Sequence, residues 1–253
     1  MGCFNSKNLS RKSLIKLFEK NIAATIIYGE YRKIMGMDLS RFLRLSASIE
    51  IYQESQCEEK EELFEHSRVN LSNGMGLYIP TNASYIDGFK DDQAYIVTRT
   101  PNSETSAYNF WRVIWQHRTE VIVMLDYHSE NQFSALFLNS DEESLLQFGK
   151  LSIKKFRAYQ NHSSFEIFRI LITHENGATL YVNYFLFKNW QRQDFSPSEY
   201  DVLDLIFMAR LYNKSVVTPE ALKGYKSPIV VHCSDGLQRS MVFCAVNIDH
   251  LDC

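Results

Sequence analysis

A cysteine and an arginine six positions apart form the part of this sequence with the clearest chemistry. Cys233 follows the apolar run Ile229-Val230-Val231 and His232, and Arg239 comes six residues later. A strand that passes through a short loop into a helix can turn the loop N–H groups toward one point, where the helix N-terminus adds partial positive charge. Such a cradle binds a phosphate dianion and lowers the pKa of the cysteine, so we expect Cys233 to be a thiolate nucleophile.

The neighbours of the cysteine have roles that follow from their residue types. Arg239 has a planar guanidinium that can hold two phosphate oxygens, and Gly236 permits a backbone conformation that a bulkier residue resists. His232 and Ser240 flank the loop and are expected to tune the thiolate by hydrogen bonding. The residues expected to bind the phosphate through the loop are Ser234, Asp235, Gly236, Leu237 and Gln238. The alternative for Cys233 is a buried structural cysteine, which is the commonest role of a free thiol.

Composition excludes several classes of protein. The 253 residues are 45% hydrophobic with 10 Gly and 5 Pro, which argues against a disordered or collagen-like chain. Lys and Arg number 27 against 30 Asp and Glu, so no basic surface suggests nucleic-acid binding. The five cysteines have no disulfide-framework or zinc spacing, and we expect neither a metal nor a cofactor. The sequence does not indicate which oligomeric state the protein adopts.

Hydrophobic periodicity predicts the elements that would position the site. We expect strands beginning near Leu77 and at 95–97, 121–125, 165–173, 179–187 and 229–231, and helices at 14–27, from Asp38 to Ile49, at 105–116, at 198–212 with Ser198 as its N-cap, and from Arg239 onward. Glu175-Asn176-Gly177 is a candidate hairpin turn. Trp111 and Trp115, four residues apart, are expected in the core. The fold class is therefore α/β (α+β), one domain with a central mixed twisted sheet flanked by helices.

The reactive stretch resembles the signature of the protein tyrosine phosphatases, Ile/Val-His-Cys-x-x-Gly-x-x-Arg-Ser/Thr, matched by 231–240. Further segments resemble the family in the same order, namely 81–89, 95–98 with the helix after Pro101, and 122–125. The resemblance runs from about residue 8 to the end and implies a phosphatase domain over 13–253 that acts on phosphotyrosyl proteins through a phosphocysteine intermediate. It also implies that Glu130 holds the arginine. The shortened, divergent sequence is similar to the phosphatases of wasp polydnaviruses (bracoviruses), which act in the host-cell cytoplasm.

The segment that should carry the general acid departs from the family pattern. The family has Trp-Pro-Asp, whereas Arg192 stands two residues after Trp190 here, and Asp194 stands four residues after it. Either Asp194 protonates the leaving phenolate through a shifted loop, or the acid is missing. Losing a general acid costs on the order of 10²–10⁴-fold in rate.

Two further departures bear on turnover and selectivity. The sequence given ends at Cys253, so the family segment with a water-positioning Gln is expected to be absent and hydrolysis of the phosphocysteine slowed. The family's Lys-Asn-Arg-Tyr motif has no counterpart near Glu58, which leaves selectivity for phosphotyrosine over phosphoserine open. Two functions therefore stay open: a phosphatase with impaired turnover, and a pseudophosphatase that binds and shields phosphotyrosyl proteins.

The first twelve residues predict a lipidated, basic segment. Gly2 and Ser6 fit the pattern for N-myristoylation, and Cys3 stands where palmitate is often added. A second signal strengthens the marginal membrane binding of one acyl chain. We expect a cytoplasmic protein associated with the cytoplasmic face of a membrane, the alternative being an unmodified terminus.

Overall fold

The computed structural model describes residues 65–72, 78–89, 91–125, 145–188, 190, 197–213 and 227–249. These residues belong to the compact unit Ser55–Cys253, whereas the other unit, Met1–Glu54, lies outside the described residues. The helices expected at 14–27 and after Asp38, and the acidic run near Glu58, also lie outside them.

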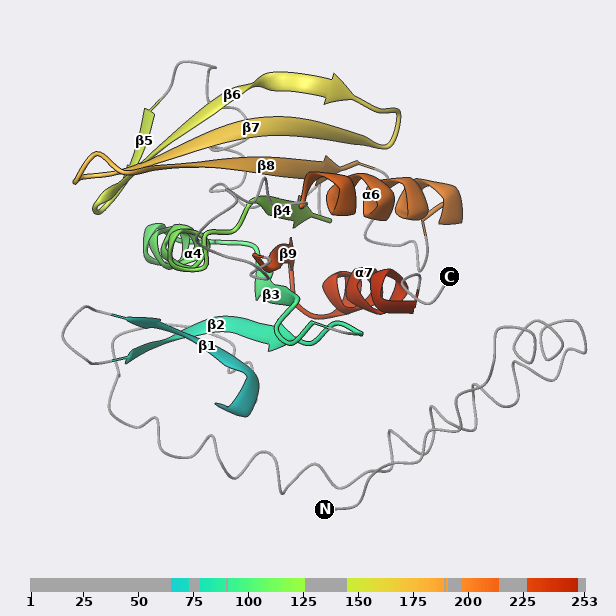
Figure 1. The fold of residues 1–253 in the computed structure, drawn as a ribbon, viewed down its shortest axis with the longest axis horizontal. Coiled ribbons are helices and arrows are strands. Elements are labelled where there is room, and N and C mark those ends of the chain that lie inside the picture. Colours follow the sequence, from blue (N-terminus) through green and yellow to red (C-terminus); the bar gives the residue numbers. More distant parts are fainter. Residues whose placement is uncertain are drawn as a thin grey trace, which may run out of the picture. The chain divides into compact units, whose positions relative to one another are not determined.

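One nine-stranded sheet forms the centre of the described structure, with strand order β1-β2-β3-β9-β4-β8-β7-β6-β5 (Figure 1). The adjacent strands β3, β9, β4 and β8 run parallel to one another, and all other neighbouring strands of the sheet pair antiparallel. The sheet is therefore mixed, as expected. The strands are β1 (Arg68–Ser72), β2 (Tyr78–Ile86), β3 (Tyr95–Arg99), β4 (Val121–Met124), β5 (Leu145–Phe148), β6 (Leu151–Asn161), β7 (Phe165–His174), β8 (Thr179–Phe187) and β9 (Ile229–Cys233).

Helices cover both faces of the sheet. Helix α4 (Glu104–Gln116) packs on one face, and α6 (Glu199–Tyr212) and α7 (Gln238–Asp249) pack on the other (Figure 1). A short 3₁₀ turn, η2 (Glu65–Ser67), precedes β1. Because successive strand side chains alternate between faces, Val230 joins the core under α4 and Val231 the core under α6 and α7. This alternation makes the strands near the site apolar on both faces.

Most expected elements are confirmed to within two residues. The hairpin turn at 175–177 is present, with Gly177 at a φ of 86°. Trp111 is buried in the core and Trp115 packs against it, as expected of the aromatic pair. Ser198 occupies the N-cap position of α6, but its side chain makes no capping hydrogen bond.

Three strands, β1, β5 and β6, were not expected from periodicity. In β6 the inward positions are Leu151, Ile153 and Lys155, and the lysine interrupts the apolar alternation. Lys155 is nevertheless buried, and its ammonium lies 5.4 Å from the ring centroid of Phe168. A cation over an aromatic face compensates part of the cost of burying a charge. A tertiary contact thus makes room in the strand for a lysine that breaks the apolar pattern of the sequence.

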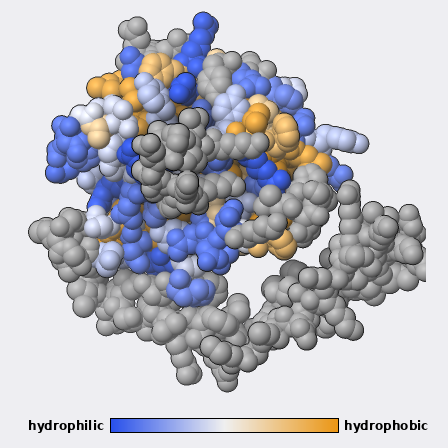
Figure 2. Space-filling view, viewed as in Figure 1, coloured by the Kyte–Doolittle hydropathy of each residue, from blue (hydrophilic) through white to orange (hydrophobic). Residues whose placement is uncertain are grey.

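Polar residues cover most of the described surface seen in Figure 2, with separate apolar patches between them. The exposed large apolar residues of the helices include Tyr200, Phe207 and Leu211 on α6 and Met241 and Val242 on α7. No helix in the described ranges is long and apolar enough to cross a membrane.

Candidate active site

The centre of the parallel sheet positions Cys233. Strand β9 lies between β3 and β4, with Cys233 opposite Arg99 and His232 opposite Met124. The backbone N–H of Thr100 donates to the Cys233 carbonyl at 2.8 Å. Cys233 thus stands at the carboxyl end of a central parallel strand, the edge where sheets of this kind bind ligands.

Gly236 lets the loop after Cys233 lie against the neighbouring strand. Its φ is 69°, in the left-handed region that favours glycine. A Cβ at this position would lie 2.6 Å from the backbone nitrogen of Arg99 and 2.9 Å from the carbonyl carbon of Thr98. The Gly236 N–H donates to the Cys233 carbonyl at 3.2 Å, which closes the turn. Both the dihedral angle and the close backbone approach therefore require glycine.

Two side chains contact the thiol of Cys233. The buried Ser240 hydroxyl donates to Sγ at 3.0 Å, which is the hydrogen bond expected of this residue. The thiol in turn donates to Asp235 Oδ1 at 3.1 Å. The same carboxylate oxygen accepts the N–H groups of Leu237 at 2.8 Å and Gln238 at 3.1 Å. Two amides expected to face a bound phosphate thus bind a carboxylate of the chain itself.

The pKa values of the Cys233 thiol and the Asp235 carboxyl group are shifted in opposite directions. Burial raises the pKa of Cys233 above its usual value; the Ser240 hydroxyl opposes this, and the Asp235 carboxylate adds to it. The expectation that the loop lowers the pKa of this thiol is therefore wrong for this conformation, because burial first, and the Asp235 carboxylate in addition, disfavour a thiolate. For Asp235, burial acts to raise the pKa. The two N–H donors, the thiol and the charge of Arg239 outweigh burial and leave that pKa below its usual value.

His232 does not tune the thiol by a side-chain hydrogen bond, contrary to expectation, because both ring nitrogens are used elsewhere. Nδ1 lies 2.9 Å from the Thr100 hydroxyl and Nε2 lies 3.0 Å from the Tyr184 hydroxyl. Tyr184 donates to Met124 Sδ at 3.1 Å. One assignment satisfies all three contacts: Thr100 donates to Nδ1, and Nε2–H donates to Tyr184.

Burial lowers the pKa of His232 to about 3, so the ring is neutral at physiological pH. The imidazole links the end of β9 to β8 and to the residue after β3. It thereby holds the backbone of Cys233 in place, which makes His232 a positioning residue.

Two free cysteines are buried in the described part of the chain, Cys233 and Cys244. Cys244 lies on α7 among the apolar side chains beneath the sheet. Burial is the largest cause of its raised pKa, and the nearby Cys233 adds to it. Of the two, only Cys233 lies at the strand end beside the loop, so Cys244 serves as an internal comparison for a structural thiol.

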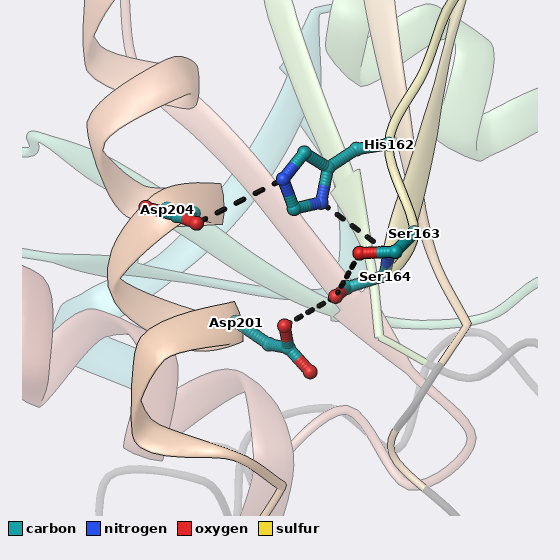
Figure 3. A network of polar contacts seen from close by, with 5 residues as sticks. All are labelled: His162, Ser163, Ser164, Asp201 and Asp204. Carbon is teal, nitrogen blue, oxygen red and sulfur yellow. Dashed lines mark hydrogen bonds and ion pairs between the residues drawn. The ribbon is translucent and has the colours of Figure 1, made fainter.

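A second polar cluster ties α6 to the turn between β6 and β7 (Figure 3). The Ser164 hydroxyl donates to Asp201, and its backbone N–H donates to Nδ1 of His162 at 3.3 Å. Nε2 of His162 lies 3.8 Å from Asp204. Serine, histidine and aspartate also make catalytic triads, but a triad needs a hydroxyl hydrogen-bonded to the imidazole. Here the ring binds a backbone N–H instead, so the cluster is structural.

The cluster contacts the residue before the segment in which the acid was expected and the helix after that segment. The N–H of Lys188 donates to the Ser164 carbonyl at 2.8 Å, and its ammonium pairs with Glu166. The described chain therefore anchors the segment before it, at Lys188, and after it, at α6. Asp194 and Arg192 lie outside the described residues, as do Glu130 and the acylation candidates Gly2 and Cys3.

Sequence reasoning missed two residues of the site and misjudged a third. Thr100 carries no local signal, and Tyr184 stands in an apolar strand where a tyrosine indicates only core packing. For Asp235 a signal existed, because a negatively charged residue inside an anion cradle contradicts the electrostatics of the cradle. The structure brings Cys233, Ser240 and the loop together, and it places the Asp235 carboxylate in contact with the thiol and the loop N–H groups.

The structure places the thiol at the end of a central parallel strand, followed by a tight loop and a helix that begins beside an arginine, which is the arrangement expected of the signature residues. Residues 55–251 match the family model for protein-tyrosine phosphatase, and the chain belongs to that family. The mixed α/β fold agrees with this assignment, because solved phosphatase structures superpose on it.

Relatives and solved structures extend the comparison. Tyrosine phosphatase H2 of Microplitis demolitor bracovirus is 29% identical over 254 residues, covering 95% of this chain and 75% of the relative. Human tyrosine-protein phosphatase non-receptor type 2 is 28% identical over 191 residues, covering 73% of this chain and 43% of the relative. A structure of PTPN18 in complex with a HER2 phosphopeptide has a TM-score of 0.72 at 20% identity, covering 94% of this chain and 82% of that one. The expected resemblance to bracovirus phosphatases is confirmed.

Proposed function

We propose that this chain hydrolyses phosphotyrosine on proteins through a phosphocysteine intermediate. The observation that carries the proposal is the 3.0 Å hydrogen bond from the buried Ser240 hydroxyl to Cys233 Sγ at the end of β9. A hydroxyl aimed at sulfur stabilises a thiolate, both as the attacking group and as the group released when the intermediate is hydrolysed. Arg239 and the loop N–H groups would hold the phosphate oxygens.

The reaction has two balanced steps. In the first, the Cys233 thiol loses its proton to solvent and the thiolate forms a bond to phosphorus, while the bond from phosphorus to the tyrosine oxygen breaks and a general acid protonates the departing phenolate. Asp194 is our candidate for that acid. In the second step, water attacks phosphorus and gives one proton to the carboxylate that the first step left deprotonated, the S–P bond breaks, and inorganic phosphate leaves with regeneration of the Cys233 thiolate. Glu130 is our candidate for the group that holds Arg239.

A second candidate function rests on the 3.1 Å contact between the Cys233 thiol and Asp235 Oδ1, which together with burial disfavours the thiolate. A neutral thiol is a poor nucleophile but does not repel a phosphate dianion. The chain would then be a pseudophosphatase that binds phosphotyrosyl proteins and shields them from other enzymes. The two candidates differ in turnover rather than in the ligand.

The substrate class and the location are part of the same proposal. PTPN18 was solved with HER2 phosphopeptides, which supports phosphotyrosyl proteins as partners here. We further propose acylation at Gly2 and Cys3, which would hold a cytoplasmic protein at the membrane surface. Mass spectrometry of the protein expressed in eukaryotic cells tests this, with Gly2→Ala as the control that must lose the myristoyl mass. A free or acetylated N-terminus in the unmodified protein would contradict it.

Turnover of a phosphotyrosyl peptide decides between the two candidates. We expect steady phosphate release that Cys233→Ala abolishes and that Cys244→Ala, the matched change at a buried structural thiol, leaves in place. A single burst with trapped phosphocysteine would show that only the second step is impaired. Peptide binding without release or burst would establish the pseudophosphatase instead.

A further inference from the structure

We propose that Asp235 is an internal anion that occupies the phosphate position of the loop, so that a substrate phosphate must displace its carboxylate to bind. The inference rests on the proposed function, because it concerns the same loop and the same ligand. Asp235 Oδ1 lies 3.1 Å from Cys233 Sγ and accepts two loop N–H groups, from Leu237 and Gln238. One oxygen atom thus contacts the nucleophile and both anion-binding amides.

The distance to sulfur shows why both anions cannot be present together. A reacting group must approach the nucleophile to about 3–3.5 Å. Asp235 Oδ1 already fills a position 3.1 Å from Sγ. A phosphate held by the N–H groups of Leu237 and Gln238 for attack by Sγ would therefore overlap the carboxylate, and two anions in contact would also repel each other.

The donors used by Asp235 are those that a phosphate would need. Gln238 is the first residue of α7 and Leu237 directly precedes it, where N–H groups have no partner within the helix and the helix dipole favours an anion. Arg239, in the first turn, lowers the pKa of Asp235 through its charge. The carboxylate therefore draws on the same positive potential that would attract a phosphate dianion.

The loop permits this exchange by movement of one side chain. Gly236 holds the backbone against Arg99, where no Cβ could fit, whereas Asp235 is only partly buried. Its carboxylate can rotate into solvent while the loop backbone stays in place. Asp235 thereby weakens the affinity of the site for any anion that must take the place of its carboxylate.

Asp235→Asn tests the proposal because it removes the charge and keeps the shape. Asparagine retains Oδ1 as an acceptor and is among the best residues for capping N–H groups at a helix start, so the loop and α7 keep their support. Asp235→Ser, another capping residue, is the second variant. Asp92→Asn, the same chemical change at an exposed turn position before β3, is the matched control.

The affinity for inorganic tungstate, measured by isothermal titration calorimetry at constant pH, is the deciding quantity. We expect Asp235→Asn and Asp235→Ser to bind this phosphate analogue about tenfold more tightly than the unmodified protein, because a charged competitor has been removed. Asp92→Asn should not change the affinity. Unchanged or weaker tungstate binding in both Asp235 variants would show that the carboxylate only caps the helix, and would overturn the proposal.

Phosphotyrosyl peptide turnover, measured on the same proteins, separates this proposal from the proposed function. Tighter tungstate binding without turnover in any of them would leave the internal anion standing and contradict the phosphatase. Turnover by the unmodified protein with no gain in tungstate affinity in the variants would leave the phosphatase standing and remove the internal anion.

Discussion

The carboxylate of Asp235 and the thiol of Cys233 are in direct contact, with 3.1 Å between Oδ1 and Sγ. Each group changes the acidity of the other: the carboxylate raises the pKa of the thiol, and the thiol helps to lower the pKa of the carboxylate. The thiol donates to the carboxylate oxygen, an arrangement that disfavours the thiolate. Removal of the carboxylate from this position is therefore coupled to formation of the thiolate.

Asp235→Asn should lower the pKa of Cys233, because it removes a negative charge and a strong acceptor from the thiol. The measurement is the rate of alkylation of the Cys233 peptide by iodoacetamide as a function of pH, followed by mass spectrometry. The midpoint should move to lower pH in this variant and stay in place in Asp92→Asn. A midpoint that is unchanged or moves to higher pH would show that Asp235 does not control the thiol.

Ser240→Ala should have the opposite effect on the same thiol. Ser240 donates to Sγ at 3.0 Å and its hydroxyl lowers the pKa of Cys233. Without it the alkylation midpoint should move to higher pH, and kcat should fall roughly 10- to 100-fold with little change in KM, since the donor acts on charge that develops during reaction. Ser240→Thr keeps the hydroxyl and should restore most of the rate. Equal losses in both variants would indicate a packing defect instead.

Gly236→Ala should destabilise the protein more than Gly177→Ala does. Both glycines have positive φ, 69° and 86°, so alanine is strained at each by about 1–2 kcal/mol. A Cβ at Gly236 would also meet the Arg99 backbone at 2.6 Å, whereas at Gly177 nothing lies within 4 Å. Urea unfolding should show the larger loss of unfolding free energy for Gly236→Ala, by about 1–3 kcal/mol of overpacking. Equal losses would contradict the close approach to β3.

The buried, neutral His232 should make stability depend on pH on the acid side. Its pKa is about 3 in the folded protein and about 6.5 in an unfolded chain, so between these values the unfolded chain binds more protons. Its contribution to stability is complete above pH 6.5 and is lost progressively as pH falls toward 3. Urea unfolding between pH 7 and 4 should show a smaller loss in His232→Gln than in the unmodified protein. The same slope in both would contradict burial of a neutral ring.

Much of the fold was predictable because it depends on local pattern. The apolar alternation in 165–173 and the apolar runs at 95–97 and 229–231 identified strands of the central sheet, and the spacing of Cys233 and Arg239 identified the loop. Strand β6 was not predictable, because Lys155 faces inward there, where its ammonium lies over the ring of Phe168. Periodicity reports the usual environment of a residue type rather than a particular compensating contact.

The sequence by itself determined the family, the nucleophile candidate and the need for glycine in the loop, since these follow from residue types at fixed short spacings. Only the tertiary structure decided the protonation of the site. The partners of His232 lie 132 and 48 residues away along the chain, and Asp235 matters through the side-chain rotamer that puts its oxygen beside Sγ. Acidity depends on burial and on the nearest charges in space, and no local pattern in the chain records either quantity.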